Sequence, residues 1–142
     1  MKYGKPGPFY QLRLDQGEDV PTVLAAFVRK MKIGSAIVTG LGAARRVELG
    51  YFDAGRRVYC RRRFPGDYEL ASITGNVAWD GCEPVCHLHA VVSGPRMTSH
   101  AGHLFAAEVT ATCELALLPG RQRLRRRVDP VTGLKLLDLP SA

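Results

Sequence analysis

The periodicity of an α-helix is clear at only one place in this chain, and that limits the fold more than any other feature. From Val20 to Met31 the apolar residues recur every three or four positions. Asp19 is suited to cap the first turn, Pro21 fits inside that turn, and Gly34 can end the helix. A single amphipathic helix must pack on an apolar surface, so we expect a β-sheet beneath it.

Most of the remaining chain alternates apolar and polar residues, which is the pattern of β-strands. Asp80-Gly81 is typical of a hairpin turn and favours antiparallel neighbours. The predicted fold class is α+β, a mixed α/β fold with a mainly antiparallel sheet of about seven strands and one main helix packed on it. The predicted strands are residues 9–14, 35–39, 46–52, 57–63, 68–77, 85–92 and 109–118.

Two segments between these strands are predicted as connections. Residues 39–43 carry two glycines and faintly resemble a phosphate-binding loop. They lack the third glycine and the following Lys-Ser/Thr, so a turn between strands is the better interpretation. Residues 93–102 are rich in Gly, Ser and Pro and are predicted as a loop that carries His100.

The domain organisation follows from the length and from the place where the strand pattern ends. A chain of 142 residues with 46% hydrophobic residues can build one core. The pattern fades after Pro119-Gly120, so we expect one domain over residues 1–118 and a basic C-terminal tail over 119–142. The tail is expected to be extended and either docks through Leu136, Leu137 and Leu139 or stays disordered.

No segment of the sequence indicates a membrane or an export route. There is no run of 18 apolar residues and no apolar signal-peptide core near the N-terminus. We therefore expect a cytoplasmic protein without a membrane partner. In that compartment the four cysteines are free thiols or metal ligands, and Cys60, Cys86 and Cys113 are expected to be buried or half-buried thiols.

All four histidines lie between Gly81 and Leu104, and three of them predict a metal site. His87 and His89 are two residues apart on a strand, so they share a face at a spacing of about 7 Å. His103, where the chain returns to the sheet, is the natural third ligand. Three imidazoles suit zinc, nickel or a similar ion with one position open. The alternative is that the histidines only form hydrogen bonds at the surface.

Other groups near this stretch leave further chemistry open. Cys82 and Cys86 could join a metal site, but no second cysteine pair follows them. If a metal-bound water reacted, Glu69, Glu108 or Glu114 would be the general base, and Glu69 is the preferred candidate.

Two arginine clusters give the chain its basic character. The formal net charge is +7, and six of the 20 Lys and Arg residues follow residue 118, against two of the 13 acidic ones. Such a surface attracts polyanions, either DNA or an acidic partner, although it could equally be solvated surface. No aromatic residues interleave the clusters, so contacts with nucleic acid would be to phosphate. The candidate contacts are Arg61, Arg62, Arg63, Arg121, Arg123, Arg125, Arg126 and Arg127.

The order of motifs resembles that of a known family, the plants and prokaryotes conserved (PPC) domain, a group that carries a DNA-binding label. The resemblance covers about residues 9–118. Its pieces are 12–19, 40–43, 47–53, 68–76, Asp80-Gly81, Pro84, His87-Leu-His89 and Gly102-His-Leu104.

The resemblance implies an α/β domain with a mainly antiparallel sheet that assembles as a homotrimer. It also implies a metal site at His87, His89 and His103, as in prokaryotic members, and a DNA-associated role. Plant members carry an AT-hook with an Arg-Gly-Arg-Pro core, which this chain lacks. The chain is therefore expected to be of the prokaryotic type.

The leading hypothesis is a non-enzymatic DNA-binding or regulatory homotrimer with a tri-histidine site for a divalent metal, most simply zinc. The alternative is a metal-dependent enzyme that acts on a small molecule with Glu69 in acid/base work. A cleft that brings Glu69 within hydrogen-bond reach of the ion would favour the enzyme.

Overall fold

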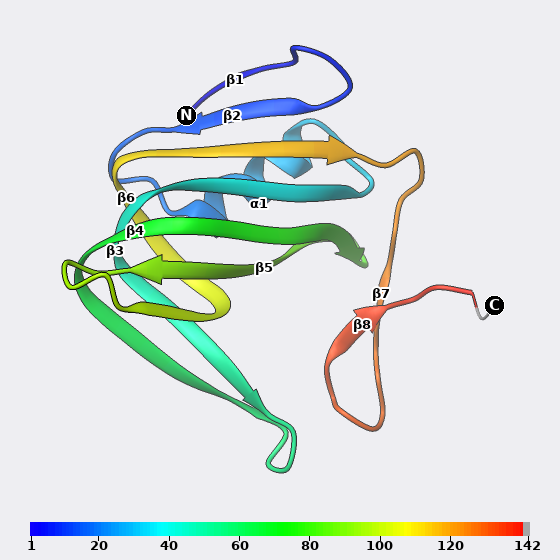
Figure 1. Cartoon of the computed structure of the whole chain (residues 1–142). Helices are drawn as coiled ribbons and strands as arrows, with labels where there is room; N and C mark the ends of the chain where they lie inside the picture. The colour runs from blue at the N-terminus through cyan, green and yellow to red at the C-terminus, as the bar shows by residue number, and fades with distance from the viewer. Residues whose placement is uncertain (141–142) are drawn as a thin grey trace.

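A mainly antiparallel sheet with one helix, the predicted fold class, is what the chain forms (Figure 1). The structure is a computed structural model that describes residues 1–140. In chain order the elements are β1 (Lys2–Gly4), β2 (Tyr10–Leu14), α1 (Val20–Lys30), β3 (Ala36–Asp53), β4 (Val58–Asp80), β5 (Glu83–Ser93), β6 (Ser99–Pro119), β7 (Arg126–Val128) and β8 (Lys135–Leu137).

The six strands of the main sheet lie in the order β1-β2-β6-β3-β4-β5, and every pairing between them is antiparallel. β5 also pairs with the first residues of β6, from His89 opposite His103 to Ser93 opposite Ser99. This extra pairing closes β3, β4, β5 and β6 into a ring of strands. β7 and β8 form a separate two-stranded sheet beside it (Figure 1).

The strands are longer than the sequence predicted, because the expected breaks are absorbed as bulges. Residues 39–43 are not a turn: they continue β3, with a register shift between Gly40 and Gly42. Both glycines are needed because β6 approaches closely. A Cβ on Gly40 would lie 2.5 Å from the Glu114 carbonyl oxygen, and one on Gly42 would lie 2.4 Å from that of Thr112. A glycine can therefore extend a bent strand as well as end one.

Two further boundaries also differ from the prediction. The predicted strands 57–63 and 68–77 are one strand, β4, although Pro65-Gly66 lies between them. The predicted loop 93–102 is shorter, because β6 already begins at Ser99.

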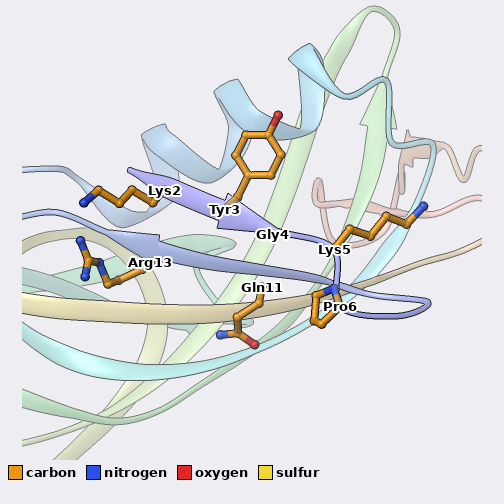
Figure 2. A pocket seen from close by; sticks show the side chains of 7 residues that line it. All are labelled: Lys2, Tyr3, Gly4, Lys5, Pro6, Gln11 and Arg13. Atoms are coloured by element: carbon orange, nitrogen blue, oxygen red, sulfur yellow. The ribbon is translucent and has the colours of Figure 1, made fainter.

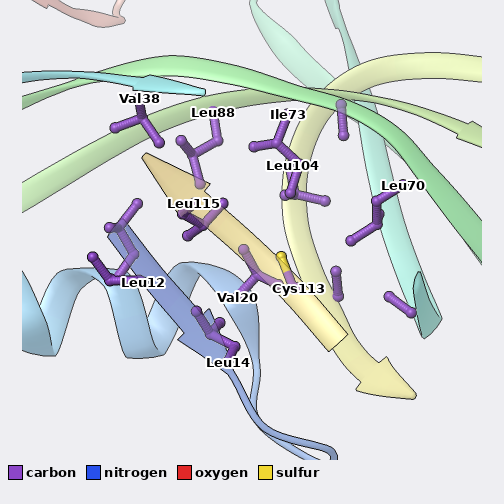
Figure 3. Packing of buried hydrophobic residues seen from close by; sticks show 14 of the residues in the cluster. Leu12, Leu14, Val20, Val38, Leu70, Ile73, Leu88, Leu104, Cys113 and Leu115 are labelled. Carbon is purple, nitrogen blue, oxygen red and sulfur yellow. The ribbon is translucent and has the colours of Figure 1, made fainter. Parts of the chain in front are cut away.

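The core lies between α1 and one face of the sheet (Figure 3). Val20, Leu24 and Phe27 of α1 are buried, and the helix contacts β5 and β6. Figure 3 shows Leu12 and Leu88 pointing into the same cluster from different strands. Alternation then decides which residues of β5 and β6 face away from the core.

The C-terminal tail docks through its backbone beside the end of β4 and the residues that precede β3. The backbone N–H of Trp79 donates to the Leu124 carbonyl at 2.9 Å, and Trp79 and Arg125 form a parallel β-bridge. The Ser35 hydroxyl donates to the Gln122 carbonyl at 2.6 Å. Of the three leucines expected to dock the tail, Leu136 and Leu139 are exposed and only Leu137 is half-buried. Residues 141–142 of the predicted tail lie outside the described residues.

The four cysteines are free, as expected, but their burial differs from the prediction at one position. Cys113 is buried and Cys86 is half-buried, whereas Cys60 is exposed, since it pairs with the exposed Tyr51 near the end of the β3–β4 hairpin. Burial raises the pKa of the Cys86 and Cys113 thiols to about 12, so both stay protonated and unreactive. No helix in residues 1–140 is long and apolar enough to cross a membrane.

The Asp19 carboxylate ties the start of α1 to the sheet, and its loss should destabilise the fold. It accepts hydrogen bonds from the Thr22 N–H at 3.2 Å and from the Ala107 N–H at 3.0 Å. We expect Asp19→Ala to lower the free energy of unfolding in urea by about 1–2 kcal/mol. Asp67→Ala, which removes an exposed carboxylate, should change it by less than about 0.5 kcal/mol. Equal effects of the two substitutions would contradict this role of Asp19.

Candidate metal centre

Three histidines meet on the face of the sheet that points away from the core. His87 and His89 flank Leu88, which is fully buried, so both imidazoles lie on the opposite face of β5. His103 precedes the buried Leu104 on β6 and lies directly opposite His89 in the register. Two strands thus supply the three side chains, as the spacing predicted for His87 and His89.

The geometry of the three rings is close to an equilateral triangle. The ring centroids are 5.2 Å apart for His87 and His89, 5.1 Å for His87 and His103, and 5.5 Å for His89 and His103. One nitrogen from each ring lies within 4.8 Å of the others. Three nitrogens bound to a tetrahedral zinc ion would be about 3.3 Å apart. Small ring rotations would therefore bring the three onto one ion.

The protonation state of the cluster suits metal binding. Burial, followed by the charges of His87 and His89 and then of Arg61 and Arg126, lowers the pKa of His103 to about 4. Burial, followed by the charge of Arg126 and then of His89, lowers the pKa of His87. Both imidazoles are therefore neutral at pH 7 and keep the lone pairs that a metal needs.

A second property of His103 also fits a metal ligand. Its Nδ1 atom is buried and has no hydrogen-bond partner in residues 1–140. A buried nitrogen without a partner is costly. The donor set and the unpartnered atom together fit a borderline ion such as zinc.

Aromatic rings form one wall of the cluster. His103 contacts Phe105 and Tyr59 at centroid distances of 4.6 and 5.1 Å. Gly50 lies opposite His103 on β3 and leaves room for these rings, because a Cβ there would lie 2.4 Å from the Phe105 ring. The Arg61 guanidinium stacks over Phe105 at 3.7 Å. Packed rings and a guanidinium thus shape this side of the cluster.

The C-terminal tail reaches the cluster beside His87. Asn76 pairs with His87 across β4 and β5, and its Oδ1 accepts a hydrogen bond from Arg126 Nη2 at 2.6 Å. Arg126 Nη1 donates to the Lys135 carbonyl at 2.8 Å. The sequence pointed to Arg126 only as part of a basic run. Its place beside the histidines depends on the docking of the tail, which no local signal indicates.

The other candidate groups lie apart from the three histidines. Glu69 is exposed and pairs with Ser93, four residues along β5 from His89, which is about 13 Å at the rise of a strand. Glu108 binds Arg45 and Arg46, and the Arg45 hydrogen bond is the main cause of its lowered pKa.

The remaining groups of the predicted stretch are also separate. Cys86 lies on the other face of β5 from His87, Cys82 is exposed in the turn before β5, and Glu114 is exposed on β6. The His100 ring packs on Phe64 at 4.7 Å.

The eight candidate arginines differ in whether their guanidinium groups bind an acidic or amide side chain. Arg61 and Arg63 bind Glu48 at 3.3 and 3.0 Å, and these arginines lower the pKa of that carboxyl. Within the tail, most guanidinium groups hold the tail in place: Arg123 stacks on Trp79 at 3.9 Å, Arg127 binds Asp138 at 3.2 Å, and Arg126 binds Asn76. Arg62, Arg121, Arg123 and Arg125 are exposed and contact no carboxylate in residues 1–140, and the Arg62 guanidinium lies over the Phe64 ring at 5.1 Å.

A separate basic hollow lies at the far edge of the sheet, between β1 and β2 (Figure 2). The Tyr3 ring points from it toward α1 and packs on Phe27 at a centroid distance of 5.1 Å. The hollow shares no residue with the histidine cluster. Its lining residues are Lys2, Tyr3, Gly4, Lys5, Pro6, Gln11 and Arg13.

Several solved structures have the same fold over almost the whole chain. A protein of Bacteroides thetaiotaomicron described as a "putative DNA-binding protein" has a TM-score of 0.93 at 26% identity, and the match covers 96% of each chain. One of Ralstonia eutropha JMP134 with the same description has a TM-score of 0.91 at 31% identity, covering 98% of this chain and 96% of that one.

The description of a third similar structure mentions a metal. It is a metal-containing protein of Archaeoglobus fulgidus, with a TM-score of 0.86 at 32% identity over 97% of this chain and 96% of that one.

No protein with a curated description matches the chain. The sequence profile of one domain family matches residues 1–119. The chain therefore belongs to the Plants and Prokaryotes Conserved (PCC) domain family, the one that its order of motifs resembles.

Proposed function

We propose that this chain is a cytoplasmic DNA-binding regulatory protein that works as a homotrimer and holds one divalent metal ion, zinc, in each subunit at His87, His89 and His103. The cluster of three mutually close imidazoles carries the proposal. The similarity to proteins described as metal-containing and as putatively DNA-binding supports it.

Zinc fits the ligands better than a harder ion does. Nitrogen ligands suit zinc, nickel and copper, whereas magnesium and calcium need oxygen ligands. The three histidines leave one of four tetrahedral positions free. Bound there, zinc would supply a localised positive charge with one open coordination position.

Substitution of the histidines tests the metal site directly. We expect protein purified without a tag and dialysed against zinc to hold one ion per chain by elemental analysis. His87→Gln and His103→Gln should each lose most of it, because two remaining ligands bind weakly. His100→Gln is the matched control: it lies on the same strand as His103 but packs on Phe64, and should keep full metal content. Unchanged metal in both ligand variants would refute the site.

An apolar patch on the uncovered face of the sheet supports assembly. Ile37, Leu118 and Leu41 are 64%, 47% and 56% exposed, and Ile37 pairs directly with Leu118 on the neighbouring strand. α1 covers the other face, so nothing in residues 1–140 shields these side chains. Exposed apolar patches on a sheet favour association, and a second and third copy of the chain would cover this one.

Light scattering tests the assembly. Wild-type protein should have three times the 15.6 kDa mass of one chain. Ile37→Asp should shift the mass toward the monomer, because it places a charge in the proposed contact. Val131→Asp, at an equally exposed apolar residue in the tail, should leave the mass unchanged. A monomeric wild type, or a trimeric Ile37→Asp variant, would contradict the proposed contact.

The charge of the assembly supports DNA binding. Each chain carries a formal net charge of +7, and a trimer multiplies this charge and its number of contacts. Arg62, Arg121 and Arg125 are exposed and contact no carboxylate in residues 1–140, so their guanidinium groups can contact phosphate. Such contacts are non-specific and weaken as salt is added.

Anisotropy with a labelled DNA duplex tests this part of the proposal. Wild-type protein should bind at low salt, and the affinity should fall steeply as the salt concentration rises. Arg62→Gln should weaken binding and reduce the slope of log affinity against log salt by about 0.9 for each phosphate that is no longer neutralised. Arg29→Gln, with the same charge change on α1 beside Glu83, should have little effect. Absence of binding at low salt would rule out a DNA-binding role.

The alternative, a metal-dependent enzyme with Glu69 as its general base, has less support. An open metal position and an aromatic wall would suit a small substrate. The general base must reach the reacting atom through at most one water molecule. Glu69 lies about four strand residues from His89, which is about 13 Å and too far for that role.

A further inference from the structure

The charge around the histidine cluster is unbalanced. Two arginines lie beside the cluster: Arg61 stacks on Phe105 at 3.7 Å, and Arg126 binds Asn76, the cross-strand partner of His87. Arg61 is partly neutralised by Glu48, whereas Arg126 contacts no carboxylate in residues 1–140. Three neutral imidazoles cannot balance a divalent ion placed beside a guanidinium.

The Arg126 guanidinium is fixed in place by neutral partners. The Asn76 side chain and the Lys135 carbonyl accept from its two terminal nitrogens at 2.6 and 2.8 Å. Its Nε atom is buried and has no hydrogen-bond partner among the described residues. Holding a cation half-buried with amide and carbonyl oxygens alone leaves its charge uncompensated.

The position of Arg126 depends on the tail, which lies outside the matched family domain of residues 1–119. Asn76 is the cross-strand partner of His87, so the hydrogen bond to Asn76 sets the guanidinium next to that histidine. β7 and β8 hold the arginine there through their own pairing. The tail therefore adds a fixed cation beside His87, which lies on β5 next to the ring of His103 that Tyr59 and Phe105 contact.

We propose that each subunit binds a small oxyanion, a carboxylate or a phosphate, with one oxygen at the open position of the metal and another on the Arg126 guanidinium. The proposal rests on the metal site proposed above and names the ligand of that site. An oxyanion fits better than a halide because it has two or more oxygens, so one can reach the metal while another accepts a charge-assisted hydrogen bond from the guanidinium. It also supplies the negative charge that the chain itself does not place there.

Calorimetry on zinc-loaded protein tests the proposal, with sodium phosphate and sodium acetate as separate probes. Saturable binding of either anion is expected. The anion that binds more tightly shows whether the natural ligand carries a phosphate or a carboxylate group. Arg126→Gln should weaken that binding at least about tenfold, because it removes a charge-assisted contact. Arg127→Gln is the matched control: the same charge is lost at the next residue, which is exposed and binds Asp138, and the affinity should stay within about twofold.

Two further measurements keep the test decisive. The emission of Trp79, the single tryptophan, reports tail docking because Arg123 stacks on its ring, and it should be unchanged in Arg126→Gln. If the substitution releases the tail, cobalt-substituted wild-type protein still provides a readout. Its visible spectrum should shift when the anion is added, and an unchanged spectrum would overturn the proposal.

The outcomes separate this proposal from the metal site. Protein that takes up no zinc would refute the metal site, and the oxyanion proposal would fail with it. Protein that holds one zinc per chain but binds neither anion would overturn the oxyanion proposal alone. Equal weakening by Arg126→Gln and Arg127→Gln would also overturn it, because general charge would then explain the binding.

Discussion

The pairing of β5 with the first residues of β6 is the contact on which the candidate site depends. It sets His89 directly opposite His103 and closes four strands into a ring. A slip of one residue would turn His103 toward the core and Leu104 outward. The burial of Leu88 and Leu104 opposes that slip, so the apolar core fixes the positions of the three imidazoles. The register of the sheet and the geometry of the site therefore have the same cause.

The electrostatics of the site come from two sources that lie far apart in the sequence. Burial among strands and rings keeps His87 and His103 neutral, which prepares their nitrogens for a metal. The tail then adds the Arg126 guanidinium without an acidic partner. Together these features support the proposed binding of a metal ion and an anion at this site. In the proposed function, the exposed arginines Arg62, Arg121 and Arg125 would bind a different and larger polyanion, DNA.

The sequence was most informative where a repeating pattern of apolar and polar residues determines the local structure. Alternation along β5 predicted that His87 and His89 share a face, and the helix around Val20 begins at the predicted cap. Strand boundaries were less predictable, because Gly40 and Gly42 serve a close approach of β6 that only the tertiary structure creates. The position of Arg126 beside Asn76 could not be predicted at all. It arises from a contact between residues 50 apart, formed by the docked tail.

Anomalous X-ray diffraction at the zinc absorption edge, from crystals grown with zinc, tests the central claim most directly. The account predicts one strong peak per subunit, about 2.0–2.1 Å from a nitrogen of each of His87, His89 and His103. A peak at other side chains, or no peak near these three residues, would contradict it.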